Sequence, residues 1–221
     1  MLLAPEEIGD GASLLTAFDA HPETIFRLAG SITPGLHEFQ IPIDPSVDSV
    51  LFSISVQCLQ TAEVVRPSGA PVVGDGVTDL SNFRAERMVI VTRPEPGVWT
   101  VRVMGSGVAG VVVQAQSAIG ISQIAFAPAR GDAEFKAVPS AGIENLLRIR
   151  MSGPVAELRA SLVSGVFQRL ADLPLSAGEV NGSFVGRVTP NAGGFRVAIA
   201  GRDAAGFVFQ RTSAPLFTPM R

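Results

Sequence analysis

The stretch Arg87–Ala127 constrains the fold more than any other part of the chain, because strand patterns alternate in it with turn-forming residues. Its segment Pro94-Glu95-Pro96-Gly97 excludes a helix, since each proline fixes φ and favours extended geometry in the residue before it. In the following Val98–Val103, successive side chains point to opposite faces of a strand. We predict four strands in this stretch, with Trp99, the chain's only tryptophan, in a core between two sheets.

The composition favours an all-β protein. The 221 residues suffice for one large β domain or two of ordinary size. Hydrophobic residues make up 47% of the chain and charged residues only 17%, below the roughly 25% of typical domains. The 23 glycines and 16 prolines are scattered along the sequence, which suits many short strands joined by turns.

The first half of the sequence predicts one β-sandwich. Residues 1–30 are the least regular, with Thr24–Ala29 as an apolar strand or helix, and we expect residues 1–35 to form an irregular connector. From Leu36 the strand pattern is steady, and in Ser49–Val56 every second residue is apolar, as in a half-buried strand. We predict a prepeptidase-like or jelly-roll-like β-sandwich domain over residues 36–128. The small and polar segment 128–133 is the expected linker.

The second half predicts another sandwich over residues 134–221. Six or seven strand patterns follow one another at a spacing of roughly ten residues, the signature of an immunoglobulin-like fold. The Cys…Trp…Cys pattern of that fold is missing, and the single cysteine, Cys58, allows no internal disulfide. The expected fold class is therefore all-β, with two consecutive β-sandwich domains, the second immunoglobulin-like.

Several segments together resemble one known family. In order, they are IPIDPSVDSVLFSIS, VRPSG, VIVTRPEPGVWTVRVMGSG, VVVQAQSAIGISQIAF and GGFRVAIAGRDAAGFVFQRTSAPLF. Their order and spacing over residues 36–217 resemble the tandem β-sandwich region that follows the von Willebrand factor A domain in hemicentins and related proteins. PEPGVWTV alone is also similar to a strand of prepeptidase-like β-sandwiches.

The resemblance implies a pair of β-sandwich domains that serve as structural or adhesive parts of secreted proteins. It implies no catalytic residue. The sequence lacks the A domain itself, and with it that domain's metal-dependent adhesion site, so any function of that domain is absent from these residues.

The residues give little support to catalysis. The two histidines, His21 and His37, have no nucleophile motif around them. A Ser-His-Asp triad assembles across space and stays an open alternative. No G-x-S-x-G elbow is present, and Gly105-Ser106-Gly107 is interpreted as a hairpin turn. A Cys58–His37 thiol pair is a further alternative, but we expect Cys58 to be a small apolar residue at the end of a strand. No enzyme is predicted.

Calcium is the one metal for which the sequence offers ligands. Asp75 and Asp79 are oxygen donors in a loop, with Asp44 and Asp48 as further donors, and β-sandwich modules use such loops to bind calcium. The segment lacks the spacing of a known calcium loop, so the alternative is a pair of solvated turn aspartates. No other cofactor is predicted.

Charge and hydropathy limit the partners and the location. A net charge of −3 provides no basic field for nucleic acid, and no apolar run approaches the ~20 residues that span a bilayer. We therefore expect no nucleic acid partner and no membrane insertion. The N-terminus lacks signal-peptide features. The expected location is extracellular or periplasmic as part of a longer chain, or cytoplasmic if Met1 is the true start.

Together these patterns predict a non-catalytic structural or protein-interaction module, of the adhesion type, in a larger or exported protein. Its partner would be another protein or a cell-surface component, and the sequence leaves the oligomeric state open. The alternative is an accessory module that attaches a secreted hydrolase to its substrate or to a surface.

Overall fold

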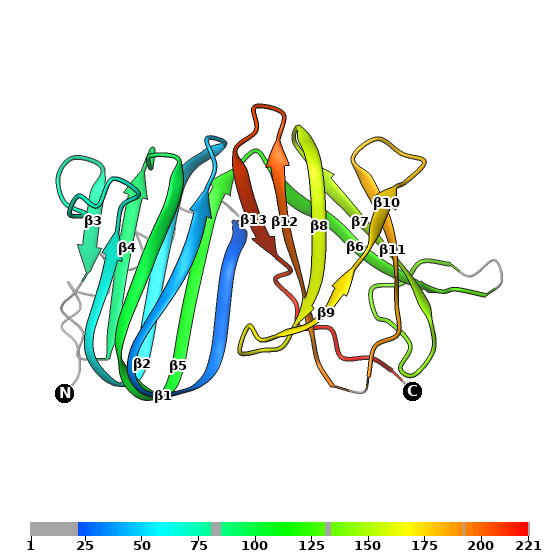
Figure 1. The fold of residues 1–221 in the computed structure, drawn as a ribbon, viewed down its shortest axis with the longest axis horizontal. Coiled ribbons are helices and arrows are strands. Elements are labelled where there is room, and N and C mark those ends of the chain that lie inside the picture. Colours follow the sequence, from blue (N-terminus) through cyan, green and yellow to red (C-terminus); the bar gives the residue numbers. More distant parts are fainter. Residues whose placement is uncertain (1–21, 81–84, 131–133, 192, 221) are drawn as a thin grey trace, which may run out of the picture.

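A computed structural model describes residues 22–80, 85–130, 134–191 and 193–220, whose regular structure is entirely β. Three antiparallel sheets make up the molecule (Figure 1). The predicted all-β class with consecutive β-sandwiches is thereby confirmed. The described part of the chain holds no helix with the length and apolarity needed to cross a bilayer.

The first sheet is built mainly from three very long strands. Its order is β1-β5-β2-β4-β3, from β1 (Glu23–Ile43), β5 (Gly97–Ser117), β2 (Val47–Val65), β4 (Glu86–Thr92) and β3 (Val77–Leu80). In Ser49–Val56 of β2 the predicted alternation holds, because the buried apolar side chains of this segment are Val50, Phe52, Ile54 and Val56.

This sheet folds over on itself and encloses its own core. Phe26 and Phe39 lie on the same strand, thirteen positions apart, which on a straight strand would separate them by about 43 Å. Their ring centroids are nevertheless only 5.4 Å apart. The bend coincides with register shifts at Ile32–Gly35 of β1 and Val56–Thr61 of β2, and Figure 1 shows the long strands turning there. One folded sheet thus provides both layers of the sandwich.

The glycines of β5 belong to this bend. Gly105-Ser106-Gly107 does not form the predicted hairpin turn, because β5 continues through it, and Arg87–Ala127 contains parts of three strands instead of four. A Cβ on Gly105 would lie 2.8 Å from the Cys58 carbonyl oxygen, and Gly107 has a φ of 89°. Glycine here allows close backbone approach inside a bent strand. In the sequence alone, such glycines resemble those of a hairpin turn.

The N-terminal boundary of the first sandwich also differs from the prediction. Residues 23–35, assigned to an irregular connector, form the first half of β1 and supply Ile25, Phe26 and Leu28 to the core. Their alternation is interrupted by a register shift after Thr24, which obscures the strand pattern in the sequence. Residues 1–21 of the predicted connector lie outside the described residues.

The second half consists of two four-stranded sheets. One has the order β10-β11-β7-β6, from β10 (Leu175–Ala177), β11 (Ser183–Val188), β7 (Asn145–Ser152) and β6 (Gly120–Pro128). The other has the order β13-β12-β8-β9, from β13 (Val208–Thr212), β12 (Arg196–Asp203), β8 (Val155–Val163) and β9 (Arg169–Leu173). Apolar side chains of both sheets form one core, in which Phe126, Phe195 and Phe217 contact one another.

The boundary between the two hydrophobic cores lies just before β6. The first core ends at Ala115 and the second begins at Ile119, whereas the predicted linker is 128–133. Since β6 pairs with β7, Gly120–Pro128 packs with the second half of the chain. The division into two domains stays a prediction, and these contacts favour a boundary between β5 and β6.

The two halves are in direct contact along β1, which lies beside β13 (Figure 1). The Ala29 amide donates to the Gly165 carbonyl at 2.9 Å. The Phe167 ring, in the turn after β8, lies 4.5 Å from that of Phe26 in the first core. The junction thus combines backbone hydrogen bonding with aromatic packing.

Candidate binding surfaces

A buried ion pair joins the two halves. Arg211 of β13 donates from Nη2 to Asp44 Oδ2 at 2.8 Å, and both side chains are fully buried. The guanidinium also donates to Ser117 Oγ and to the carbonyls of Ile119 and Gln210. A buried charge is tolerated when its donors and acceptors are satisfied in this way. Asp44, considered above as a metal ligand, therefore has a structural partner.

Trp99 organises the loops at one end of the first sandwich. Its ring is fully buried beside Phe52, as predicted, and its Nε1 donates to the Glu95 carbonyl at 3.0 Å. The Glu95 carboxylate in turn accepts from the Ser68 amide at 2.9 Å. The Arg66 guanidinium lies 5.6 Å from the centroid of the Trp99 ring. Two loops distant in sequence are thereby held in one arrangement.

The electrostatics of Glu95 agree with this arrangement. The hydrogen bonds from Ser68 lower the pKa of the Glu95 carboxyl group, with a smaller contribution from the charge of Arg66. Such hydrogen bonds stabilise the charged form. Glu95 therefore bridges the two loops as an anion at neutral pH.

The calcium candidates lie around the start of the first sheet's edge strand. Asp75 is exposed in the turn before β3, and Asp79 lies in β3 itself. The Asp79 carboxylate forms an ion pair with Arg87 at 2.6 Å. Among the described residues, no group of three or more histidine, cysteine or acidic side chains comes together. Calcium binding by Asp75 and Asp79 stays a prediction.

The residues of the two catalytic alternatives, the Ser-His-Asp triad and the Cys58–His37 pair, are placed as follows. His21 lies outside the described residues. The His37 ring hydrogen-bonds to the Thr33 carbonyl at 2.8 Å. Cys58 is exposed at the bend of β2, whereas we expected a small apolar residue at the end of a strand. The register shifts on either side of it could not be read from the sequence.

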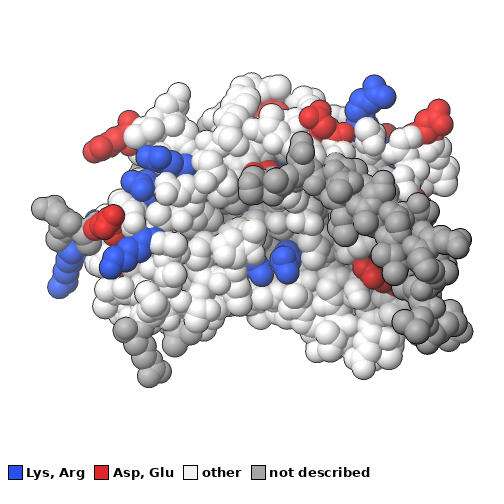
Figure 2. All heavy atoms as spheres, turned by 180° about the vertical axis from the view of Figure 1, so that it is seen from behind, with Lys and Arg blue, Asp and Glu red and all other residues white. Residues whose placement is uncertain are grey.

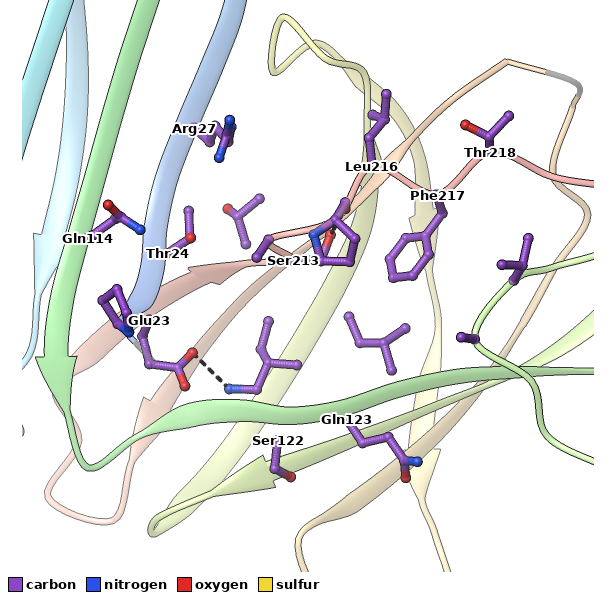
Figure 3. A pocket seen from close by; sticks show the side chains of 18 residues that line it. Glu23, Thr24, Arg27, Gln114, Ser122, Gln123, Ser213, Leu216, Phe217 and Thr218 are labelled. Atoms are coloured by element: carbon purple, nitrogen blue, oxygen red, sulfur yellow. Dashed lines mark hydrogen bonds between the residues drawn. The ribbon is translucent and has the colours of Figure 1, made fainter. Parts of the chain in front are cut away.

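A cavity with a volume of about 870 Å³ lies at the junction of the two halves. Its walls are the first residues of β1, the beginning of β6 and the segment that follows β13 (Figure 3). Glu23, Arg27 and Gln114 line one side of it, and Leu216 and Phe217 line another. The cavity combines charged, amide and apolar groups, a mixture typical of small-molecule sites.

The charged groups of this junction cavity are unequally partnered. The Glu23 carboxylate accepts from the Ile121 amide at 3.1 Å. Burial raises the pKa of the Glu23 carboxyl group, and this outweighs the Ile121 hydrogen bond and the charge of Arg211, which both lower it. In contrast, Arg27 forms no ion pair within the described residues, and its Nε is buried without a hydrogen-bond acceptor.

Charged side chains elsewhere are dispersed. Figure 2 shows a face that is mostly uncharged, with a few lysine or arginine atoms near its centre and the other charges scattered singly or in small groups. Exposed ion pairs such as Arg102–Glu38 and Arg187–Glu144 contribute little to stability, because water screens them.

The fold defines a protein of the β-sandwich module class. More particularly, residues 27–118 match the family model described as hemicentin galactose-binding domain-like, which is less than half of the chain. This match coincides closely with the folded-over first sheet. It confirms the resemblance of this region to hemicentins.

Two other comparisons add little. No curated protein matches the sequence. Among solved structures, a Bacillus licheniformis lipase, BlEst2, in its propeptide form is similar with a TM-score of 0.42 and 10% sequence identity. The superposition covers 89% of this chain and 41% of the lipase chain, so this chain spans less than half the length of that protein.

The sequence did not reveal the residues of the junction. Arg211, Asp44, Glu23 and Arg27 are far apart along the chain, and each resembles an ordinary strand or turn residue in its local context. Arg211 itself ends a predicted strand between the polar residues Gln210 and Thr212, so its local context did not indicate a buried partner.

Proposed function

We propose that this chain is a non-catalytic, adhesion-type interaction module of a larger exported protein, which recognises another protein or a cell-surface component. The observation that carries the proposal is the match of residues 27–118 to the hemicentin region. The same resemblance supports the proposed extracellular or periplasmic location.

The loop end held by Trp99 is the proposed recognition surface. Because Trp99, Glu95 and Ser68 connect the loops, little conformational freedom would be lost when a partner binds. Val73 and Val98 lie in or beside these loops and are exposed, at 71% and 49%. Apolar side chains on a rigid loop surface suit contact with another protein.

Strand addition provides a second route of recognition. The edge strand β3 pairs with β4 on one side, and no other described strand covers its opposite side. Such an edge offers backbone donors and acceptors to an extended segment of a partner.

Site-directed photo-cross-linking tests the proposal. A photoreactive residue replaces Val98 at the loop end, and the matched control carries it at Leu36, which is 56% exposed at the bend. Each protein is irradiated with surface extract of the producing organism, and cross-linked products are identified by mass spectrometry. The purified partner is then titrated against Val98→Glu and Leu36→Glu variants.

We expect the photoreactive residue at position 98 to cross-link one defined protein. The affinity for that protein should fall about tenfold or more in Val98→Glu but not in Leu36→Glu, as expected for a central contact. Equal cross-linking and equal affinity loss at both positions would refute the proposal that the loop end is the recognition surface. Attachment to a polysaccharide without a protein partner would support the accessory module of a hydrolase instead. Turnover of ester, peptide or glycoside substrates would refute the non-catalytic function.

A further inference from the structure

The junction cavity is lined by an arginine that has no anionic partner among the described residues. Arg27 lines the cavity, and its Nε is buried without an acceptor. Arg196 of β12 is 8% exposed, and its Nη1 donates to the carbonyls of Ser213 and Ala214, which line the same cavity. The Arg196 Nε is likewise without a partner in the described part of the protein.

The two guanidinium groups are close enough to affect one another. Burial lowers the pKa of Arg196, and the charge of Arg27 lowers it further. Two like charges at a partly dehydrated site are unfavourable without a counter-charge. Unused N–H donors beside them add to this cost, because a buried donor without an acceptor loses its hydration.

Glu23 does not supply the missing counter-charge. Its carboxylate accepts the Ile121 amide, and the neighbouring arginine that affects its pKa is Arg211. Since burial raises the pKa of Glu23, the site also disfavours its charged form. An anion from solution would satisfy Arg27 better, and a carboxylate matches the planar fork of a guanidinium.

The other residues that line the cavity indicate the chemistry of the rest of the ligand. Gln114 contributes an amide group, which can pair with ligand hydroxyls, whereas the Ser122 hydroxyl already donates to the Arg150 carbonyl. Leu216 and Phe217 provide an apolar face opposite (Figure 3). A volume of about 870 Å³ lies within the range of small-molecule sites.

We propose that the junction cavity binds a sugar acid, a hydroxylated organic carboxylate whose carboxyl group is held by Arg27 with Arg196 beside it. The ligand is either a free sugar acid or a uronate residue at the end of a polysaccharide, since both present the same chemistry. This site goes beyond the proposed protein-recognition surface, because it lies at the junction and uses other residues.

Isothermal titration calorimetry on the full chain tests the site. The probes are sodium D-glucuronate, a glucuronate-terminated tetrasaccharide, neutral D-glucose and inorganic phosphate. The variants are Arg27→Gln, which removes the charge, and Arg27→Lys, which keeps the charge but loses the fork. Arg148→Gln is the matched control, because Arg148 also has an unpaired Nε but stacks on Phe135 and does not line the cavity. Circular dichroism verifies that each variant is folded.

We expect saturable binding of glucuronate or of the glucuronate-terminated tetrasaccharide. The probe that binds with the higher affinity shows whether the ligand is a free sugar acid or the end of a polysaccharide. Affinity should fall about tenfold or more in Arg27→Gln, less in Arg27→Lys and not at all in Arg148→Gln. The proposal is overturned if neither uronate binds up to about 10 mM, if glucose binds equally well, or if Arg27→Gln binds as tightly as the unmodified chain. Phosphate binding as tight as that of glucuronate would identify a simple anion site and also overturn it. If Arg27→Gln does not fold, the Arg27→Lys result decides.

Discussion

Arg211 and Asp44 form a fully buried ion pair, with 2.8 Å between Nη2 and Oδ2, although 167 positions separate them in the sequence. The pair connects β13 of the second half to the turn between β1 and β2. Because each charge depends on the other for compensation, the junction behaves as part of the folded core.

Breaking this pair should strongly destabilise the protein. Arg211→Met leaves the Asp44 carboxylate buried and unpaired, and should lower the free energy of unfolding by roughly 3–5 kcal/mol in urea titrations. Adding Asp44→Leu should restore much of the loss. The exposed Arg102–Glu38 pair is the control, and Arg102→Met should cost less than about 1 kcal/mol. Equal costs for both arginine variants would contradict the structural role of Arg211.

Trp99 should be among the most sensitive core positions. Trp99→Ala removes a fully buried ring, and should cost roughly 3–5 kcal/mol by urea unfolding followed with circular dichroism. Trp99→Phe keeps an aromatic ring but loses the hydrogen bond to the Glu95 carbonyl, so its cost should be smaller. A loss below about 1 kcal/mol for Trp99→Ala would place the ring at the surface.

The bend of the first sheet should not tolerate a side chain at Gly105. A Cβ there would lie 2.8 Å from the Cys58 carbonyl, so Gly105→Ala should lower the free energy of unfolding by about 1–3 kcal/mol. Gly110 of the same strand is the control, because a Cβ added to it would meet no described atom within 4 Å. Thermal unfolding of both variants measures the difference, and similar melting temperatures would argue against the close approach at Gly105.

The pKa of Glu23 should produce a pH-dependent stability. Burial raises it in the folded state, so the folded protein binds this proton more tightly than the unfolded chain does. The free energy of unfolding therefore falls as pH rises through the window between the two pKa values. Glu23→Gln should raise Tm at pH 7, and the difference should vanish below the ordinary glutamate pKa of about 4.3. Calorimetric Tm values at several pH values measure this effect, and a constant difference would exclude it.

Fragments should locate the boundary between the two sandwiches. A fragment of residues 119–221 keeps every strand of both four-stranded sheets, whereas 134–221 lacks β6 and with it Phe126 of the second core. We expect cooperative thermal unfolding for the longer fragment only. Cooperative unfolding of 134–221 would instead support the linker predicted at 128–133.

The sequence was informative where structure depends on neighbouring residues. The alternation in Ser49–Val56 identified a half-buried strand, and Pro94–Gly97 identified the turn before Trp99. The order of several such segments was also sufficient to recognise the hemicentin-like region. The residues after Thr24 could not be assigned firmly to a strand and were placed in the connector, because a register shift interrupts their alternation.

The sequence by itself thus determined the all-β class, the burial of Trp99 and the family resemblance, because period-two alternation and proline or glycine turns act over a few residues. Only the tertiary structure decided that the first sheet folds over, that Gly105 marks a bend within a strand, and that Arg211 meets Asp44. It also brought Arg27 and Glu23 of β1 to the cavity beside β6. Such contacts depend on packing between segments far apart in the chain, which no local pattern records.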